Sequence, residues 1–309
     1  MIRIALLCFV LLLAAGCGNY DLNKDGISTG KLKVGVDNSY SLMMDSQIFV
    51  FKELYKHADV IPSYAPEGDV IQALLDDSIQ AAVICRPLNE KEMDYFKSKQ
   101  RFPESTKIAI DAVAFIVHPD NKDTVFTMQQ LTNVFAGKST TWKSATGTGA
   151  EAPINIVFDN AKSCNERTIR EKLLNNAPLP ANCYAVSNNE EVIKYVSENK
   201  NALGVISVSW ISDKDDPTAQ SFLDKIKVVG LIDSTNEMRP TLPRRPFQSY
   251  VFDETYPLRR EVYFIRTGLK GTLGTGFASF LAGEKGQLII HKMGMVAANA
   301  PTRTVKITD

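Results

Sequence analysis

Short apolar segments alternate with longer amphipathic segments along most of this chain, and this alternation restricts the fold more than any other feature of the sequence. From Lys31 onward, runs such as 31–36 and 81–85 are rich in β-forming residues, whereas 46–57 has apolar residues at helical spacing. The pattern indicates an α/β protein with helices on both faces of its sheets. Because 309 residues exceed what one ordinary domain holds, we expect two lobes.

Two long β-rich segments predict where the lobes meet. Residues 107–117 form a run longer than a typical strand, so we interpret it as a crossing between lobes, and 258–265 is the candidate return crossing. The predicted division of the chain is a signal peptide at 1–16, a tether at 17–30, the first part of lobe 1 at 31–112, lobe 2 at 113–257 and a return to lobe 1 at 258–309.

The N-terminal residues resemble a bacterial export signal. Arg3 precedes an apolar run from Ile4 to Ala15 that is too short to cross a bilayer as a stable helix. The run ends in Leu13-Ala14-Ala15-Gly16-Cys17, which resembles the lipobox cut by the bacterial lipoprotein signal peptidase. We therefore expect a lipid on Cys17 that anchors the protein to a bacterial membrane, in the periplasm or cell envelope. A plain secretory signal with an incidental cysteine is the alternative.

Composition and residue spacing exclude several kinds of partner. Acidic and basic residues number 35 each, and no block of lysine and arginine occurs, so nucleic acid is not an expected partner. The three histidines stand apart from one another and the cysteine spacing fits no zinc pattern, so neither a metal nor a cofactor is expected. In an oxidising compartment, Cys164 and Cys183 could form a disulfide or remain free thiols.

Four segments of the chain together resemble the substrate-binding proteins of bacterial ABC phosphate importers. These segments are Asp111–Asn121, Thr127–Trp142, Tyr256–Arg260 and Phe280–Gly294. The resemblance implies the two-lobed type 2 periplasmic binding protein fold, in which each lobe is a mixed sheet flanked by helices and two crossing strands join the lobes. It also implies a monomer that captures phosphate or a related small anion in the cleft and passes it to ABC permease subunits, without catalysis.

The first predicted ligand-binding turn follows the strand at 31–36. It runs Asp37-Asn38-Ser39-Tyr40-Ser41, and the predicted ligand-binding residues in it are Asn38, Ser39, Tyr40 and Ser41. The resemblance makes Ser39 the first hydroxyl donor to the anion and Ser41 a second candidate, and backbone N–H groups at a helix start attract negative charge. The alternative is an ordinary Asx or serine cap of the following helix, since both residue types are favoured there for local reasons.

Arg86 is the predicted charged contact from lobe 1. It follows the strand at 81–85 and precedes Pro87, so we expect its planar fork to reach a cleft ligand near the carboxyl end of the strand. The alternative is an ion pair with a neighbouring carboxylate such as Glu90 or Glu92.

In lobe 2 the predicted donors are Ser163, Cys164 and Asn165, which lie between a strand and a helix. The family usually has an arginine and then Ser-Gly-Thr at this place. This chain keeps the serine, replaces the glycine and the threonine, and lacks the preceding arginine. Arg167, in the first turn of the helix, could supply the missing charge or could be a solvated helix residue.

Two carboxylates bear on the identity of the ligand. Glu67 stands where the family often has a serine-glycine turn, and its charge would repel a dianion. It could cap the helix from outside the cleft, or accept a proton from a monoanionic or organic ligand. Asp111 begins the crossing strand and is either close to the ligand at the hinge or a buried cap.

Two alternatives to this function stay open. One is the same fold with a different ligand or a partner protein, and the other is a hydrolase, for which no nucleophile elbow is present.

Overall fold

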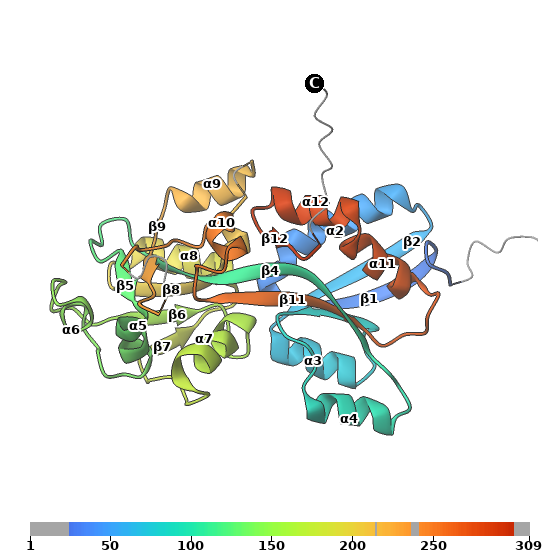
Figure 1. Ribbon diagram of the computed structural model, residues 1–309, viewed down its shortest axis with the longest axis horizontal. Helices are drawn as coiled ribbons and strands as arrows, with labels where there is room; N and C mark the ends of the chain where they lie inside the picture. Colours follow the sequence, from blue (N-terminus) through green and yellow to red (C-terminus); the bar gives the residue numbers. More distant parts are fainter. Residues whose placement is uncertain (1–24, 214, 236–240, 300–309) are drawn as a thin grey trace, which may run out of the picture.

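Two long strands join two lobes in the computed structural model, which describes residues 25–213, 215–235 and 241–299 (Figure 1). The strands are β4 (Glu104–Val117) and β11 (Arg259–Arg266), and they pair antiparallel along the whole of β11. They correspond to the two crossings expected from the sequence. The predicted signal peptide, most of the tether and Cys17 lie outside the described residues.

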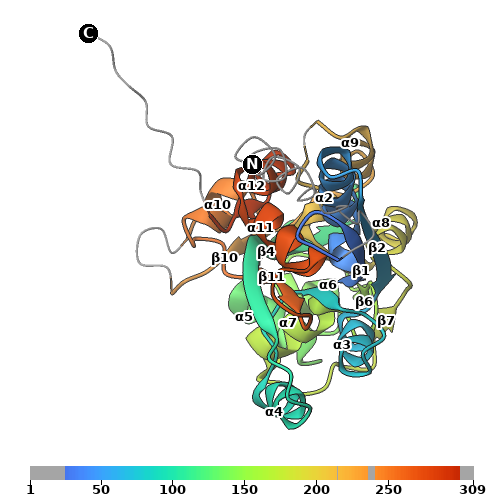
Figure 2. The same ribbon diagram turned by 90° about the vertical axis from the view of Figure 1, so that its right-hand side faces the viewer.

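Lobe 1 has helices on both faces of its strands. The strands are β1 (Gly30–Asp37), β2 (Ala58–Ala65), β3 (Ala81–Ile84) and the short β12 (Val296–Ala297). The helices are the 3-10 helix η1 (Asn38–Tyr40), α2 (Ser41–Leu54), α3 (Glu67–Leu75), α4 (Glu90–Ser98), α11 (Leu273–Ala282) and α12 (Glu284–Lys292). Figures 1 and 2 show α2, α11 and α12 on one side of the strands and α3 and α4 on the other.

Lobe 2 is built in the same way from the middle of the chain. Its strands are β5 (Val125–Thr127), β6 (Asn155–Phe158), β7 (Cys183–Ala185), β8 (Ala202–Ser207), β9 (Lys227–Val228) and β10 (Gly230–Ile232). Its helices are α5 (Met128–Phe135), α6 (Trp142–Thr146), α7 (Cys164–Leu174), α8 (Asn189–Glu198), η2 (Val208–Trp210), α9 (Pro217–Leu223) and α10 (Gln248–Phe252).

Strand pairing makes one sheet continuous from lobe to lobe. The order is β2-β1-β3-β11-β4-β8-β6-β7. Pairing is parallel among β1, β2 and β3 and among β6, β7 and β8, whereas β11 and β4 run antiparallel to their neighbours. Every residue of β3 and β8 is buried, as strands covered by helices on both faces require. The division of the lobes at 112/113 and 257/258 stays a prediction, because β4 and β11 run through both lobes.

Local sequence signals begin several helices. Asn89 and Glu92 form a capping box at the start of α4, and Thr127 and Gln130 form another at the start of α5. Helix α2 begins at Ser41 rather than at 46, because η1 leads directly into it. The predicted turn at 38–41 is therefore the entrance to this helix.

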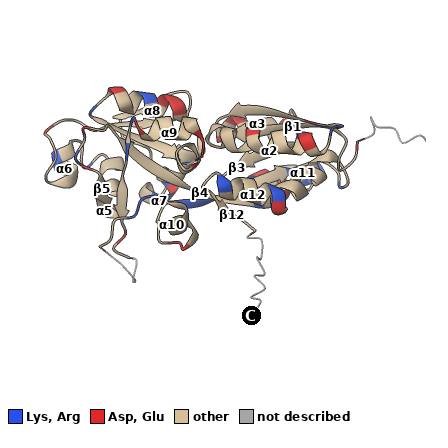
Figure 3. Cartoon of the chain, turned by 90° about the horizontal axis from the view of Figure 1, so that it is seen from above, with Lys and Arg blue, Asp and Glu red and all other residues tan. Residues whose placement is uncertain are grey.

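Charged residues are interspersed over the surface. Figure 3 shows Lys and Arg mixed with Asp and Glu along the described elements of both lobes, which is the usual pattern of a solvated protein surface. No helix in the described part of the chain has the length and the apolar character that a bilayer span requires.

Aromatic residues fill the core of lobe 1 between its sheet and the helices α2 and α11. Phe277 is fully buried, and its ring meets Phe51 edge-on at a centroid distance of 4.9 Å and Phe264 at 5.6 Å. Phe280 packs against the same group, with its centroid 5.2 Å from that of Phe51. These contacts fix α2 and α11 on the strand that crosses between the lobes.

Removing the Phe277 side chain should destabilise the protein strongly. We expect Phe277→Ala to lower the free energy of unfolding by about 3–5 kcal/mol, because it leaves a cavity in a close-packed cluster. The matched control is Phe49→Ala on α2, whose side chain is 68% exposed and whose loss should change stability by less than about 0.5 kcal/mol. Guanidinium unfolding followed by circular dichroism measures both, and equal effects would contradict this account of the core.

Candidate functional site

Three backbone N–H groups from both lobes converge on the carboxylate of Asp37. The N–H of Ser39 donates to Oδ1 at 2.9 Å, and the N–H groups of Glu67 and Cys164 donate to Oδ2 at 2.8 and 3.2 Å. Glu67 and Cys164 are the first residues of α3 and α7, so two helix N-termini, with their positive dipole ends, face each other here. We call these three N–H groups the anion cradle.

Glu67 lies beside the cradle in lobe 1 and forms an ion pair with Arg167 of lobe 2. Its side chain is 2% exposed and accepts hydrogen bonds from Arg167 Nε and from Arg167 Nη2 at 3.3 Å. The thiol of Cys164 donates to Oε2 at 2.8 Å, and the N–H of Cys85 donates to the same oxygen at 3.2 Å. Burial is the largest single influence and would raise the pKa of Glu67, but Arg167, the Cys164 thiol and Arg86 together outweigh it and hold the pKa below its usual value.

A buried ion pair lies where the crossing strands leave lobe 1. Arg260 donates to Asp111 Oδ2 from Nε at 3.0 Å and from Nη2 at 2.8 Å, and these two residues are register partners on β11 and β4. Ser207 Oγ donates to the same oxygen at 2.8 Å, and the guanidinium lies over the ring of Tyr40. Asp111 Oδ1 has no hydrogen-bond partner among the described residues.

The lobe 2 side of the site is a network of polar side chains behind the cradle. Ser163 Oγ donates to Asp159 Oδ1 at 2.6 Å, and Asn189 Nδ2 donates to Oδ2 at 3.0 Å. Asn165 Nδ2 lies 3.2 Å from Asn189 Oδ1 and 3.5 Å from Ser39 Oγ across the lobe boundary. Burial, with a smaller contribution from the negative charge of Asp37, raises the pKa of Asp159 to about 7.

The structure brings most of the predicted ligand-binding residues to one place. Ser39, Cys164, Asn165, Arg167 and Asp111 all take part in contacts where the lobes meet. Their role in binding a ligand stays a prediction, because the contacts described are with the chain itself.

Other predicted residues have local roles. Ser41 Oγ donates to the carbonyl of Asn38 at 3.2 Å, which is a contact within the turn. The side chain that caps this turn is that of Asp37, which accepts the N–H of Ser39. Ser163 caps α7 by accepting the N–H of Glu166. Tyr40 is fully buried beneath Arg260.

In the structure Arg86 makes the ion pair with Glu92 that the sequence left open as the alternative, and its role in binding a ligand stays a prediction. Its guanidinium makes a two-pronged pair with Glu92, at 2.8 Å to Oε2 and 2.7 Å to Oε1, because a planar fork matches a carboxylate in the first turn of α4. Its Nε is 3.5 Å from Glu67 Oε1, so Arg86 lies beside the cradle without donating into it.

The cysteine pairing considered from the sequence is also absent. Cys85, Cys164 and Cys183 are free thiols, and Cys164 is turned toward Glu67 instead of Cys183. The ligand atoms of Glu67, Cys85 and Cys164 lie within 4.8 Å of one another, as the donors of a metal ion would. However, Arg167 Nη2 lies 2.8 Å from Cys85 Sγ, and burial raises the pKa of the Cys164 thiol, so a positive guanidinium and a protonated thiol oppose a cation here.

Two residues of the site were not predicted from the sequence to be ligand-binding residues, although one of them, Asp37, stands in the first predicted turn. Asp37 ends a strand just before Asn38 and Ser39, which is a local sequence signal for an Asx cap. Its second contact, with the N–H of Cys164 in lobe 2, joins distant parts of the chain and has no local sequence signal. Arg260 lies in the segment Tyr256–Arg260, which carried only the family resemblance.

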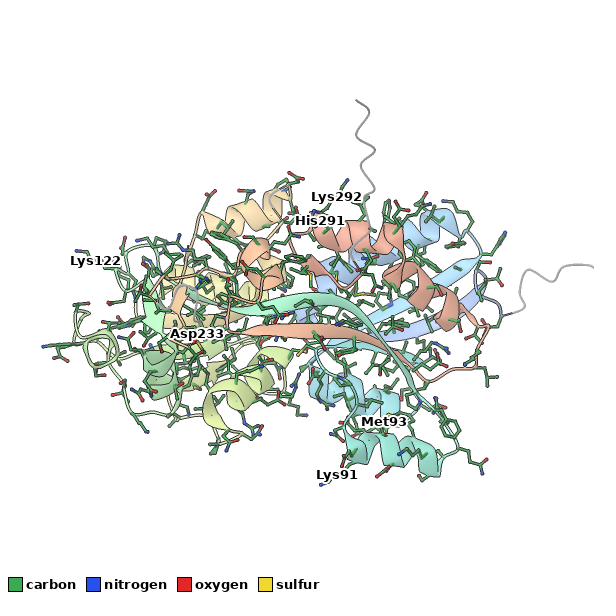
Figure 4. The ribbon with its side chains drawn as sticks, viewed as in Figure 1. Lys91, Met93, Lys122, Asp233, His291 and Lys292 are labelled. Carbon is green, nitrogen blue, oxygen red and sulfur yellow. The ribbon has the colours of Figure 1, made fainter. Side chains whose placement is uncertain are left out.

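A cavity of about 510 Å³ lies on the other side of the crossing strands, between α12 of lobe 1 and α10 of lobe 2. Its lining includes His291 and Lys292, which Figure 4 labels on α12. Gln248 bounds the cavity and donates to the carbonyl of Met295 at 2.6 Å. Because the converging N–H groups lie at the cradle and not in this cavity, we place the candidate ligand site at the cradle.

The fold and the cradle together define a class of protein. Two lobes, a sheet that continues through two crossing strands and a cradle for negative charge between the lobes are the features of a periplasmic solute-binding protein. The chain belongs to the PBP superfamily, whose domain model matches residues 23–285.

Relatives and solved structures agree with this family. The phosphate-binding protein PstS of Staphylococcus aureus (strain USA300) is 24% identical over 300 residues, which cover 95% of this chain and 84% of that protein. A protein assigned to phosphate ABC transport as a substrate-binding protein, from Clostridium perfringens and solved with bound phosphate, matches with a TM-score of 0.71 and 19% identity, over 87% of this chain and 100% of that one. An ABC-type phosphate transport receptor from Vibrio cholerae has a TM-score of 0.64 at 18% identity, over 87% and 100% of the two chains. These likenesses confirm the predicted type 2 periplasmic binding protein fold.

Breaking the buried pair of the crossing strands should be costly. We expect Asp111→Ala to lower the free energy of unfolding by about 3–5 kcal/mol, because it leaves the Arg260 guanidinium buried without its partner. Lys107→Ala is the matched control, since Lys107 pairs with Glu261 on the same two strands but at the surface, and its loss should cost at most about 1 kcal/mol. Urea unfolding of both variants measures the difference, and a mild effect at Asp111 would show that its charge is not buried in solution.

Asp159 should make the protein less stable as pH rises through the weakly acid range. Its pKa is raised from 3.8 to about 7 by folding, so the folded form holds an extra proton between these values. The contribution of protonated Asp159 to the free energy of unfolding is fully present below about pH 4 and is lost by about pH 7. Asp159→Asn should therefore flatten the fall in unfolding free energy over this window. Parallel profiles for Asp159→Asn and the unmodified protein would rule out a raised pKa.

Proposed function

We propose that this chain is an exported solute-binding protein that captures phosphate or a similar small oxyanion between its lobes and delivers it to an ABC permease, and that it catalyses no reaction. The proposal includes a lipid anchor at Cys17, in the periplasm or cell envelope, and a monomeric state. The names of its relatives and of the similar solved structures support phosphate as the first ligand to test.

One observation carries the proposal: N–H groups from both lobes meet at a single point, and that point holds a negative charge. Contacts of this kind exist together only when the lobes are closed, so an anion held by donors from both lobes is bound in the closed form. Arg167 is the nearest guanidinium from lobe 2, and its charge could pass from Glu67 to a bound oxyanion.

A small carboxylate is the second candidate ligand. The group that the cradle holds in the structure is itself a carboxylate, that of Asp37, so the geometry accepts two coplanar oxygens. Titration of the purified protein with phosphate, sulfate, molybdate and acetate distinguishes the two candidates. If none of these four anions binds, the result favours the remaining alternative, in which the same fold binds a partner protein.

Arg167 should be required for anion binding. We expect Arg167→Ala to weaken phosphate binding at least tenfold in calorimetric titration, because a charge-assisted hydrogen bond is lost. Arg170→Ala is the matched control, since Arg170 lies one turn further along α7 and pairs with Glu166. That variant should bind as the unmodified protein does. Equal losses in both variants would indicate a general electrostatic effect rather than a role in the site.

A further inference from the structure

The anion cradle is already occupied by a group of the chain itself. We propose that Asp37 is an internal occupant of the site, which competes with the incoming anion and thereby sets the affinity and selectivity of the protein. The inference rests on the proposed function, in that it takes the cradle to be the place where an external anion binds.

The hydrogen bonds show why the competition is direct. Asp37 Oδ2 accepts the N–H groups of Glu67 and Cys164 at once, and Oδ1 accepts the N–H of Ser39. Each backbone N–H makes one strong hydrogen bond, so an oxyanion cannot use these donors until the Asp37 side chain has left them. The carboxylate thus takes the place of two oxygens of a ligand.

Charge strengthens the competition. Asp37 is 0% exposed, and Glu67 lies directly beside it. A dianion placed next to both carboxylates would meet two like charges in a site shielded from water, where such repulsion is strong. A ligand with fewer charges, or one that arrives as Asp37 withdraws, meets less repulsion, so the residue discriminates among anions.

The same contacts close the lobes without an external ligand. Lobe 1 and lobe 2 are joined by the hydrogen bond from Cys164 to Asp37, by the pairing of Arg167 with Glu67, and by the N–H of Gly68, which donates to the carbonyl of Lys162 at 3.1 Å. A ligand shifts the equilibrium between the open and closed forms only if the closed form gains contacts that it lacked before. A ligand that takes over the hydrogen bonds of Asp37 adds few such contacts and therefore shifts the equilibrium little. Closure and ligand capture are therefore partly uncoupled in this chain.

Asp37→Ala tests the proposal, because it vacates the cradle at a backbone conformation that alanine adopts freely. Calorimetric titration with inorganic phosphate should show binding at least tenfold tighter than that of the unmodified protein. In small-angle X-ray scattering, the unmodified protein without ligand should be compact and should change little on adding phosphate. The variant should be more extended and should become compact when phosphate is added.

Asp69→Ala is the matched control. Asp69 is an exposed carboxylate of α3 that bridges to Lys162 of lobe 2 at 2.8 Å, so its loss removes one negative charge and one contact between lobes without touching the cradle. Its phosphate affinity should stay within about twofold of that of the unmodified protein. A tenfold gain in this control as well would overturn the proposal, because the effect would then be one of general charge.

Asp37→Asn covers the case in which the alanine variant does not fold, since three buried N–H groups would lose their acceptor. The asparagine keeps the shape and an acceptor oxygen but not the charge, and it should bind phosphate at least threefold tighter than the unmodified protein. If the unmodified protein binds phosphate and neither Asp37 variant binds it more tightly, the inference fails while the proposed function stands. If the unmodified protein and both variants bind none of the anions tested, the proposed function fails and the inference fails with it.

Discussion

A negative charge buried between two lobes must be balanced, and the structure balances it with backbone dipoles drawn from both sides. The carboxylate of Asp37 receives N–H groups from η1, α3 and α7. No single lobe supplies all three donors, so the charge is fully satisfied only when the lobes are together. The N-termini of α3 and α7 are therefore held to one carboxylate, which requires both of them to stay in place.

The arginines near the site are each matched to a carboxylate of the chain. Arg86 pairs with Glu92, Arg167 with Glu67 and Arg260 with Asp111. Little surplus positive charge is then left on these side chains, and the attraction for an anion comes mainly from the converging N–H groups. A cradle of neutral dipoles can exchange one anion for another without creating an unpaired guanidinium, which suits a protein that must release what it binds.

The parts of the structure that follow from local patterns could be predicted from the sequence, and the parts that join distant residues could not. The crossing strands and the alternating lobes follow from β-rich runs and helical spacing, and the structure has them near the expected bounds. The pairing of Arg167 with Glu67 joins residues 100 positions apart, and that of Cys164 with Asp37 joins residues 127 apart. Arg86 was expected at the ligand, and in the structure it pairs with Glu92, because closing a loop to a partner six residues away costs little chain entropy. Cys164 faces Glu67 because α7 begins at the lobe boundary, which no cysteine spacing reveals.

The cradle and the hinge share one hydrogen-bond network. The carbonyl of Ser39 accepts Ser209 Oγ at 2.8 Å, Ser209 Oγ lies 2.7 Å from Ser207 Oγ, and Ser207 Oγ donates to Asp111, the partner of Arg260 on the crossing strands. Opening the cleft separates Ser39 of lobe 1 from Ser209 of lobe 2, which leaves a buried hydroxyl to find another acceptor. One group of this network with spare capacity is Asp111, whose Oδ1 has no hydrogen-bond partner among the described residues. The strands that must bend are therefore in contact, through two serines, with the turn that forms the cradle. The two hydroxyls have one proton each and can make two of these three hydrogen bonds at a time, so movement at either place changes the hydrogen bonds available at the other.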